Sequence, residues 1–100
     1  MNVKEEVKSR LDAGASVVLV DFRADWCNPC KTMDPILEAA ATKDGVELLR
    51  VDIEEHQAAA HTFQIRSIPF IIAFGQDNKR GELIGVQQAA AVDRLVESVK

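Results

Sequence analysis

The sequence contains few cysteines, few aromatic residues and no surplus of positive charge. Its 100 residues include two cysteines and no tyrosine, and only 5% are aromatic. Two cysteines are too few for the disulfide framework of a small secreted protein. Twelve Lys+Arg against sixteen Asp+Glu give a net charge of −4, and the basic residues are not clustered. Nucleic acids and anionic membrane surfaces are therefore not expected as partners, because both favour clustered positive charge.

Long hydrophobic runs and targeting signals are also missing. The longest apolar stretches, Val17–Val20 and Ile68–Phe74, fall far short of the roughly 20 residues that span a bilayer. The first residues mix charges of both signs, unlike a signal peptide, so a cytoplasmic location is expected. With 47% hydrophobic residues, the chain is expected to form a single domain over residues 1–100.

Alternating hydrophobic patterns predict an α/β fold. Helices are predicted over Val3–Leu11, from Pro29 into the low forties, over Glu54–Phe63 and around Val92–Val99. Strands are predicted over Val17–Phe22, Val46–Ile53, Phe70–Phe74 and Glu82–Val86, with a polar hairpin loop at Gln76–Arg80. A strand–helix–strand start implies two parallel strands, whereas a hairpin is antiparallel, so the four strands should form a mixed sheet.

A Cys-Asn-Pro-Cys motif follows the first strand and opens the second helix. Residues three apart on a helix lie about 5–6 Å apart, so Cys27 and Cys30 can form a disulfide with little backbone movement. Cys27 at the helix N-terminus meets free N–H groups that favour a thiolate, and Pro29 suits this first turn. Cys30, one turn further in, should keep its proton longer. We therefore expect Cys27 to attack a substrate disulfide and Cys30 to resolve the mixed disulfide.

Two other interpretations of the cysteines compete with a redox-active pair. They could be two small buried apolar residues, as free cysteines often are. They could also be half of a metal site completed by His56 and His61, but the two histidines lie five apart, about 140° around a helix, and would not converge. No metal is therefore expected, and both histidines should be solvated.

Two stretches of the chain resemble thioredoxin. They are Val20–Lys31, which contains the Cys-Asn-Pro-Cys motif, and Ile65–Phe70. The resemblance covers nearly the whole chain and implies a thioredoxin fold and dithiol–disulfide exchange. It implies disulfide-containing client proteins and a reductase or small thiol as electron donor. No bound cofactor is implied, because the two cysteines carry the electrons.

The resemblance also gives roles to residues outside the motif. It implies a cis bond at Ile68–Pro69 beside the cysteines, where the Ile68 backbone would pair with an extended substrate segment. Asp21 matches a buried carboxylate behind Cys30, whose pKa burial raises toward neutrality and which accepts the Cys30 proton. The residues expected to bind substrate are Trp26, Asn28, Pro29, Ile68, Pro69, Ile84 and Gly85.

The chain departs from the family pattern at several positions. Arg50 replaces a usual lysine and is expected to pair with Asp21, which would lower the Asp21 pKa and weaken it as a base. Arg23 stands where an aromatic residue is usual. Asn28 replaces a usual glycine, and an amide donor aimed at the thiolate would make the protein more oxidising. The family's first edge strand has no counterpart, so the Val46–Ile53 strand should be an exposed edge of a monomer.

Three functions are compatible with these residues. The first is a protein-disulfide reductase that uses the Cys-Asn-Pro-Cys motif. The second keeps the same residues but has the more oxidising poise of an isomerase or oxidase. The third is a thioredoxin-fold binding module in which docking is the function and redox chemistry is incidental.

Overall fold

The computed structural model describes residues 1–100, and its helices and strands follow the expected order. The helices are α1 (Val3–Asp12), α2 (Asn28–Ala40), α3 (Gln57–Thr62) and α4 (Ala89–Val99). The strands are β1 (Val17–Arg23), β2 (Val46–Asp52), β3 (Phe70–Gly75) and β4 (Arg80–Ile84). None of the four helices combines the length and apolar character needed to cross a membrane.

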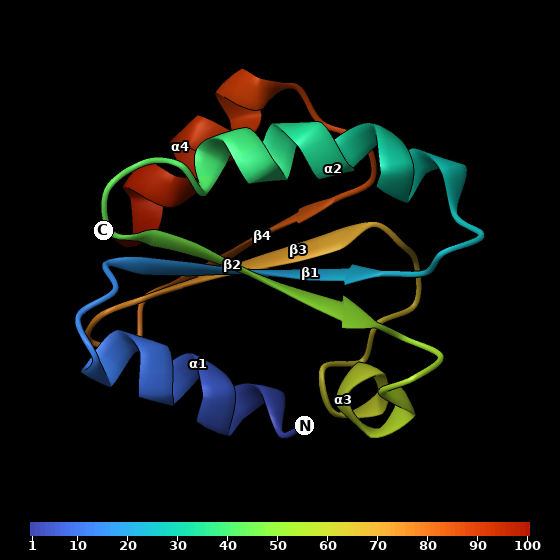
Figure 1. Cartoon of the computed structure of the whole chain (residues 1–100), viewed down its shortest axis with the longest axis horizontal. Coiled ribbons are helices and arrows are strands. Elements are labelled where there is room, and N and C mark those ends of the chain that lie inside the picture. The colour runs from blue at the N-terminus through green and yellow to red at the C-terminus, as the bar shows by residue number, and fades with distance from the viewer.

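The four strands form one mixed sheet in the order β2-β1-β3-β4. β1 runs parallel to β2 and antiparallel to β3, and β3 and β4 form an antiparallel hairpin. Helices α2 and α4 cover one face of the sheet, and α1 and α3 cover the other (Figure 1). The expected α/β fold, with a mixed four-stranded sheet and four helices, is confirmed.

Strand β1 lies in the middle of the sheet and contributes to both hydrophobic layers. Val17 and Leu19 belong to the core beneath α2 and α4, whereas Val18 and Val20 belong to the core on the α1 side. Successive side chains of a strand point to opposite faces. Asp21 and Arg23 therefore follow Val17 and Leu19 onto the α2 side, which is where the motif helix lies.

Two predicted elements have shifted boundaries. Helix α3 begins at Gln57 rather than Glu54, because the Asp52 carboxylate accepts hydrogen bonds from the backbone N–H groups of Glu54 and Glu55 and holds them in a turn. Strand β4 covers Arg80–Ile84 rather than Glu82–Val86. The hairpin is tighter than expected because Asp77 and Asn78 both adopt positive φ, at 60° and 62°.

Strand β2 is an outer strand of the four-stranded sheet, as expected. One side chain of α1 covers part of it. The guanidinium of Arg10 lies 3.4 Å from the carbonyl oxygen of Leu48 and 3.5 Å from the Glu47 carboxylate. A charged side chain thus occupies part of the position that a neighbouring strand would take.

Helix α1 provides a small test of local stability. The side chain of Asn2 caps this helix by accepting a hydrogen bond from the Glu5 backbone N–H at 3.1 Å. Asn2→Ala should lower the free energy of unfolding by about 1 kcal/mol, because that N–H loses its partner. Urea denaturation measures the change. Asn2→Ser retains a capping oxygen and should stay close to the parent, so an equal loss in both variants would contradict the capping role.

Candidate active site

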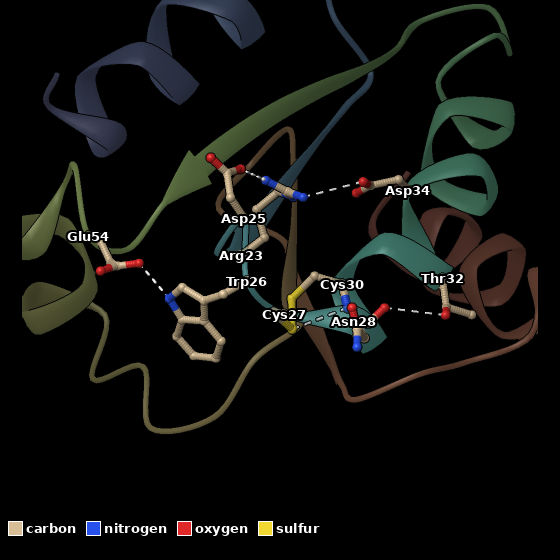
Figure 2. The surroundings of a disulfide bond; sticks show 9 residues. All are labelled: Arg23, Asp25, Trp26, Cys27, Asn28, Cys30, Thr32, Asp34 and Glu54. Carbon is tan, nitrogen blue, oxygen red and sulfur yellow. Dashed lines mark hydrogen bonds and ion pairs between the residues drawn. A yellow bond between two sulfur atoms is a disulfide. The ribbon is translucent and has the colours of Figure 1, made fainter.

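The cysteine motif lies where β1 leaves the sheet and α2 begins. Cys27 is the N-cap of α2 and has an extended backbone, and its sulfur accepts a hydrogen bond from the Cys30 backbone N–H at 3.2 Å. Pro29 lies within the first turn, where a missing N–H leaves no helical bond unmade. Cys27 and Cys30 form a disulfide, with Cα atoms 5.3 Å apart (Figure 2). The strand-to-helix junction thus holds the two sulfurs at bonding distance.

The two sulfurs lie in a small apolar cluster with unequal access to solvent. Cys27 is 4% exposed and Cys30 is fully buried. Ala24 completes the cluster, and Ile53 and Ile68 pack against it. Of the two cysteines, only Cys27 therefore offers any surface to a partner. This is the asymmetry that a nucleophile and a resolving thiol require.

The segment that precedes β3 lies beside β4. The Ile68–Pro69 peptide bond is cis, as the resemblance implied, and Pro69 is buried. The Pro69 carbonyl accepts a hydrogen bond from the Gly85 N–H at 2.9 Å. Gly85 has a φ of +78°, a conformation that a side chain would strain, whereas its neighbour Ile84 is 51% exposed. Ile68, Pro69, Ile84 and Gly85 therefore lie next to one another, and Ile68 connects them to the cysteines.

Trp26 and Asn28 flank Cys27 in the sequence but make different contacts. Trp26 is 65% exposed, and its indole N–H donates to the Glu54 carboxylate on the loop after β2 (Figure 2). Asn28 is exposed, and its backbone carbonyl accepts a hydrogen bond from the Thr32 hydroxyl at 3.4 Å. Its amide makes no hydrogen bond to the Cys27 sulfur in this disulfide form, so the donor considered for a more oxidising protein is not in place.

Asp21 is the one fully buried charged residue of the chain. It is 0% exposed, and neither carboxylate oxygen has a hydrogen-bond partner in the protein. Burial raises the pKa of Asp21 from 3.8 to about 6, and the negative charge of Asp34 adds to the increase. The positive charges of Arg23 and Arg50 act in the opposite direction but do not outweigh burial. The carboxyl therefore changes its charge close to neutral pH.

Two arginines lie near Asp21, yet neither forms an ion pair with it. Arg50 is the β2 residue directly opposite Asp21 in the sheet register, but its guanidinium pairs with Glu38 and lies 4.0 Å from Asp34. Arg23 pairs with Asp25 at 2.9 Å and with Asp34 at 3.4 Å (Figure 2). The predicted Arg50–Asp21 pair is therefore wrong, because acidic side chains of α2 take the arginine instead.

Histidines do not join the cysteines. His56 is half-buried at the N-cap position of α3, where its side chain makes no capping hydrogen bond, and His61 is exposed at the other end of the helix. No group of three or more His, Cys, Asp and Glu side chains lies close enough to hold a metal ion. Because the two cysteines are bonded to each other, they are more than a pair of small apolar core residues.

Comparisons with known proteins identify the family. The family model named Thioredoxin matches residues 1–98 of the chain. The chain belongs to the thioredoxin family. A thioredoxin of Mycobacterium tuberculosis is 41% identical over 86 residues, covering 82% of this chain and 72% of that protein. A thioredoxin of Chlamydia pneumoniae is 35% identical over 83 residues, covering 82% and 81%.

Solved structures agree with this thioredoxin assignment. A mutant thioredoxin from Halobacterium salinarum matches with a TM-score of 0.80 and 30% identity, covering 97% of this chain and 83% of that one. Thioredoxin from Schistosoma mansoni matches with a TM-score of 0.77 and 29% identity, covering 92% and 85%. The fold is therefore the thioredoxin fold. With the bonded Cys27–Cys30 pair at the start of α2, this thioredoxin is a thiol–disulfide oxidoreductase.

Sequence reasoning missed the acidic residues that surround this thioredoxin site. Asp34 and Glu38 of α2 hold the two arginines, and Glu54 holds the Trp26 indole. A signal for the first two was present, because Cys30, Asp34 and Glu38 recur at intervals of four and so lie along one side of a helix. No comparable pattern marked Glu54, which reaches Trp26 from a loop 28 residues further along the chain.

Proposed function

We propose that this thioredoxin is a protein-disulfide reductase in which Cys27 is the nucleophile and Cys30 the resolving thiol. The observation that carries the proposal is the asymmetry of the disulfide. Cys27 is the N-cap of a 13-residue helix and is 4% exposed, whereas Cys30 lies one turn further along and is fully buried. The helix N-terminus stabilises a thiolate at Cys27 because its free N–H groups and dipole favour negative charge.

The reaction proceeds in two exchanges from the dithiol form. The Cys27 thiolate attacks one sulfur of the client disulfide; a Cys27–client bond forms, the client S–S bond breaks, and the second client sulfur leaves as a thiolate that takes a proton from solvent. Cys30 then loses its proton to the Asp21 carboxylate and attacks the Cys27 sulfur. The Cys27–Cys30 disulfide forms, and the other client sulfur leaves as a thiolate. Two electrons pass from the dithiol to the client.

Client docking is assigned to the exposed surface beside Cys27. The half-exposed side chain of Ile84 and the largely exposed Trp26 offer apolar contact, and Asn28 and Pro29 are exposed next to the nucleophile. The backbone between Ile68 and Pro69, held against Gly85, would pair with an extended client segment, as in strand addition. A separate reductase or small thiol then reloads the disulfide. We place this monomeric reductase in the cytoplasm, where the thiol pool keeps such a cycle supplied.

The decisive experiment is a titration of the Cys27–Cys30 couple in defined thiol–disulfide buffers, followed by the fluorescence of Trp26, the only tryptophan. We expect a potential near about −270 mV, which is the established value for thioredoxin rather than one calculated for this chain. A value near or above about −180 mV would instead assign an isomerase or oxidant. The absence of any reversible couple would leave a binding module as the remaining function.

The spacer residue Asn28 gives this titration a matched control. Because its amide makes no hydrogen bond to the Cys27 sulfur in the disulfide form, Asn28→Gly should move the potential by no more than about 10 mV. A shift of about 30 mV toward more reducing values would correspond to about 1.4 kcal/mol. That result would mean that the amide turns toward the thiolate once the disulfide opens.

A further inference from the structure

The two arginines beside the buried carboxyl of Asp21 are held by other acidic side chains. Arg23 pairs with Asp25 on the loop before α2 and with Asp34 of α2, and Arg50 pairs with Glu38 of α2. Arg23 follows Asp21 by two positions on β1 and shares its face, and Arg50 is its direct partner on β2. Both long side chains start within reach of the Asp21 carboxylate. Neither donates to it, and both of its oxygens lack a hydrogen-bond partner in the protein. The positions of the two arginines on the strands therefore do not determine which carboxylates their guanidinium groups bind.

Asp34 lies between the two arginines. One of its oxygens is 3.4 Å from the Arg23 guanidinium, and the other is 4.0 Å from that of Arg50. The Arg23 side chain is only 13% exposed and that of Asp34 23%, so this pair is shielded from solvent. Glu38, one turn further along α2, binds Arg50 as well, but it is 59% exposed and its hold is weakened by solvent.

We propose that Asp34 is a positioning residue that draws the guanidinium groups of Arg23 and Arg50 toward α2 and so leaves the Asp21 carboxyl unpaired and able to take a proton. The proposal rests on the proposed function, in which Asp21 accepts the Cys30 proton. An Asp21 carboxylate paired with either arginine would remain charged and would be a poor proton acceptor.

The other acidic side chain that binds Arg23 is Asp25, at 2.9 Å, but it is 86% exposed and solvent weakens its hold. On the side of β3, the residue opposite Asp21 is Ile71, and Phe70–Gly75 carries no charge. The charges that act on Asp21 are those of Asp34, Arg23 and Arg50. From α2, Glu38 faces the same arginines, and Cys30 titrates only when the disulfide is reduced. The balance between one carboxylate and two guanidiniums thus sets the electrostatic field at Asp21.

The test follows the Asp21 carboxyl directly by carbon-13 NMR of aspartate-labelled, oxidised protein between about pH 4 and about pH 9. In the oxidised form the two cysteines do not titrate, so the Asp21 signal is not coupled to them. Asp34→Asn keeps the size of the side chain but removes its charge. It should lower the Asp21 titration midpoint by about one unit, because the negative charge is lost and Arg23 and Arg50 keep only the exposed partners Asp25 and Glu38. An unchanged or raised midpoint would overturn the proposal.

Glu47→Gln is the matched control. Glu47 is also a carboxylate paired with an arginine next to β2, but its partner Arg10 belongs to α1, on the other side of the sheet. This variant should leave the Asp21 midpoint where it is. An equal fall in Glu47→Gln and Asp34→Asn would show a general charge effect and would overturn the role of Asp34.

Two further variants separate the release of an arginine from the simple loss of a negative charge. Arg23→Gln alone should raise the midpoint. It should raise it by more in the Asp34→Asn background than in the parent, because only there can the guanidinium approach Asp21. An equal rise in both backgrounds would show a simple loss of charge and would contradict the proposal, as would a fall in the single variant. The single variant also serves if Asp34→Asn does not fold.

Kinetics distinguish this proposal from the proposed function. If Asp21 takes the Cys30 proton, the rate of disulfide reduction should rise with pH as Asp21 ionises, and in Asp34→Asn this rise should move to lower pH by the same amount as the NMR midpoint. An NMR shift without any kinetic shift would support Asp34 as the positioning residue while excluding Asp21 as the proton acceptor.

Discussion

Replacement of Cys30 by serine is expected to stop turnover after the first exchange and to leave the client attached to Cys27. Cys30 is fully buried and bonded to Cys27, so it is the only thiol placed to displace a bound client. Reduction of a protein disulfide should fall to the level measured without enzyme. A covalent complex should accumulate that a strong reductant dissolves, and non-reducing electrophoresis with mass spectrometry identifies its linkage.

The reciprocal variant supplies the control for this experiment. Cys27→Ser removes the more exposed of the two cysteines and leaves Cys30 fully buried, so it should neither turn over nor trap a client. Trapping by Cys27→Ser and not by Cys30→Ser would reverse the two roles. Equal binding of clients by the double serine variant would favour the binding module, because no covalent chemistry is left to that protein.

Asp21→Asn is expected to stabilise the oxidised protein at pH 7 by about 2 kcal/mol. Asp21 is fully buried, and its pKa is raised from 3.8 to about 6, which corresponds to about 3 kcal/mol against folding once the group is ionised. Asparagine removes the charge at similar size, although burying its amide N–H₂ offsets part of the gain. Urea denaturation at pH 7 measures the difference.

The pH dependence of that difference identifies its cause. Between about pH 4 and about pH 6 the folded parent binds more protons at Asp21 than the unfolded chain, so its free energy of unfolding falls as pH rises and then levels off. The advantage of Asp21→Asn should therefore vanish below about pH 4. Asp44→Asn replaces an exposed aspartate and should change stability by no more than about 0.5 kcal/mol at any pH. A gain for Asp21→Asn that persists in acid would exclude ionisation as the cause.

The disulfide and the mixed character of the sheet could be predicted because both follow from local patterns. Spacing places Cys27 and Cys30 on adjacent turns, and alternating strand and helix patterns leave few topologies. The family resemblance supplied the cis bond at Pro69 and the burial of Asp21, which residue patterns alone did not determine. All of these predictions concern the path of the backbone, and many different side chains are compatible with the same path.

The arginine contacts could not be predicted in the same way. Arg50 does lie opposite Asp21 in the sheet, so the expected neighbour is correct and only the contact is wrong. A long side chain can reach several carboxylates, and the one it binds depends on how α2 packs over the sheet. The presence of Arg23, where an aromatic residue is usual, also needs the structure to explain it. The arginine pairs with Asp34, which lies on another element.

The outer strand β2 has an edge without a neighbouring strand. Such a strand would bury that edge in a row of backbone hydrogen bonds, which salt hardly affects. Here part of the cover comes from the Arg10 side chain at Leu48 and Glu47, which is held largely by charge and stands on a separate helix. Salt should therefore loosen the cover of this edge, because it screens the attraction between the guanidinium and the Glu47 carboxylate.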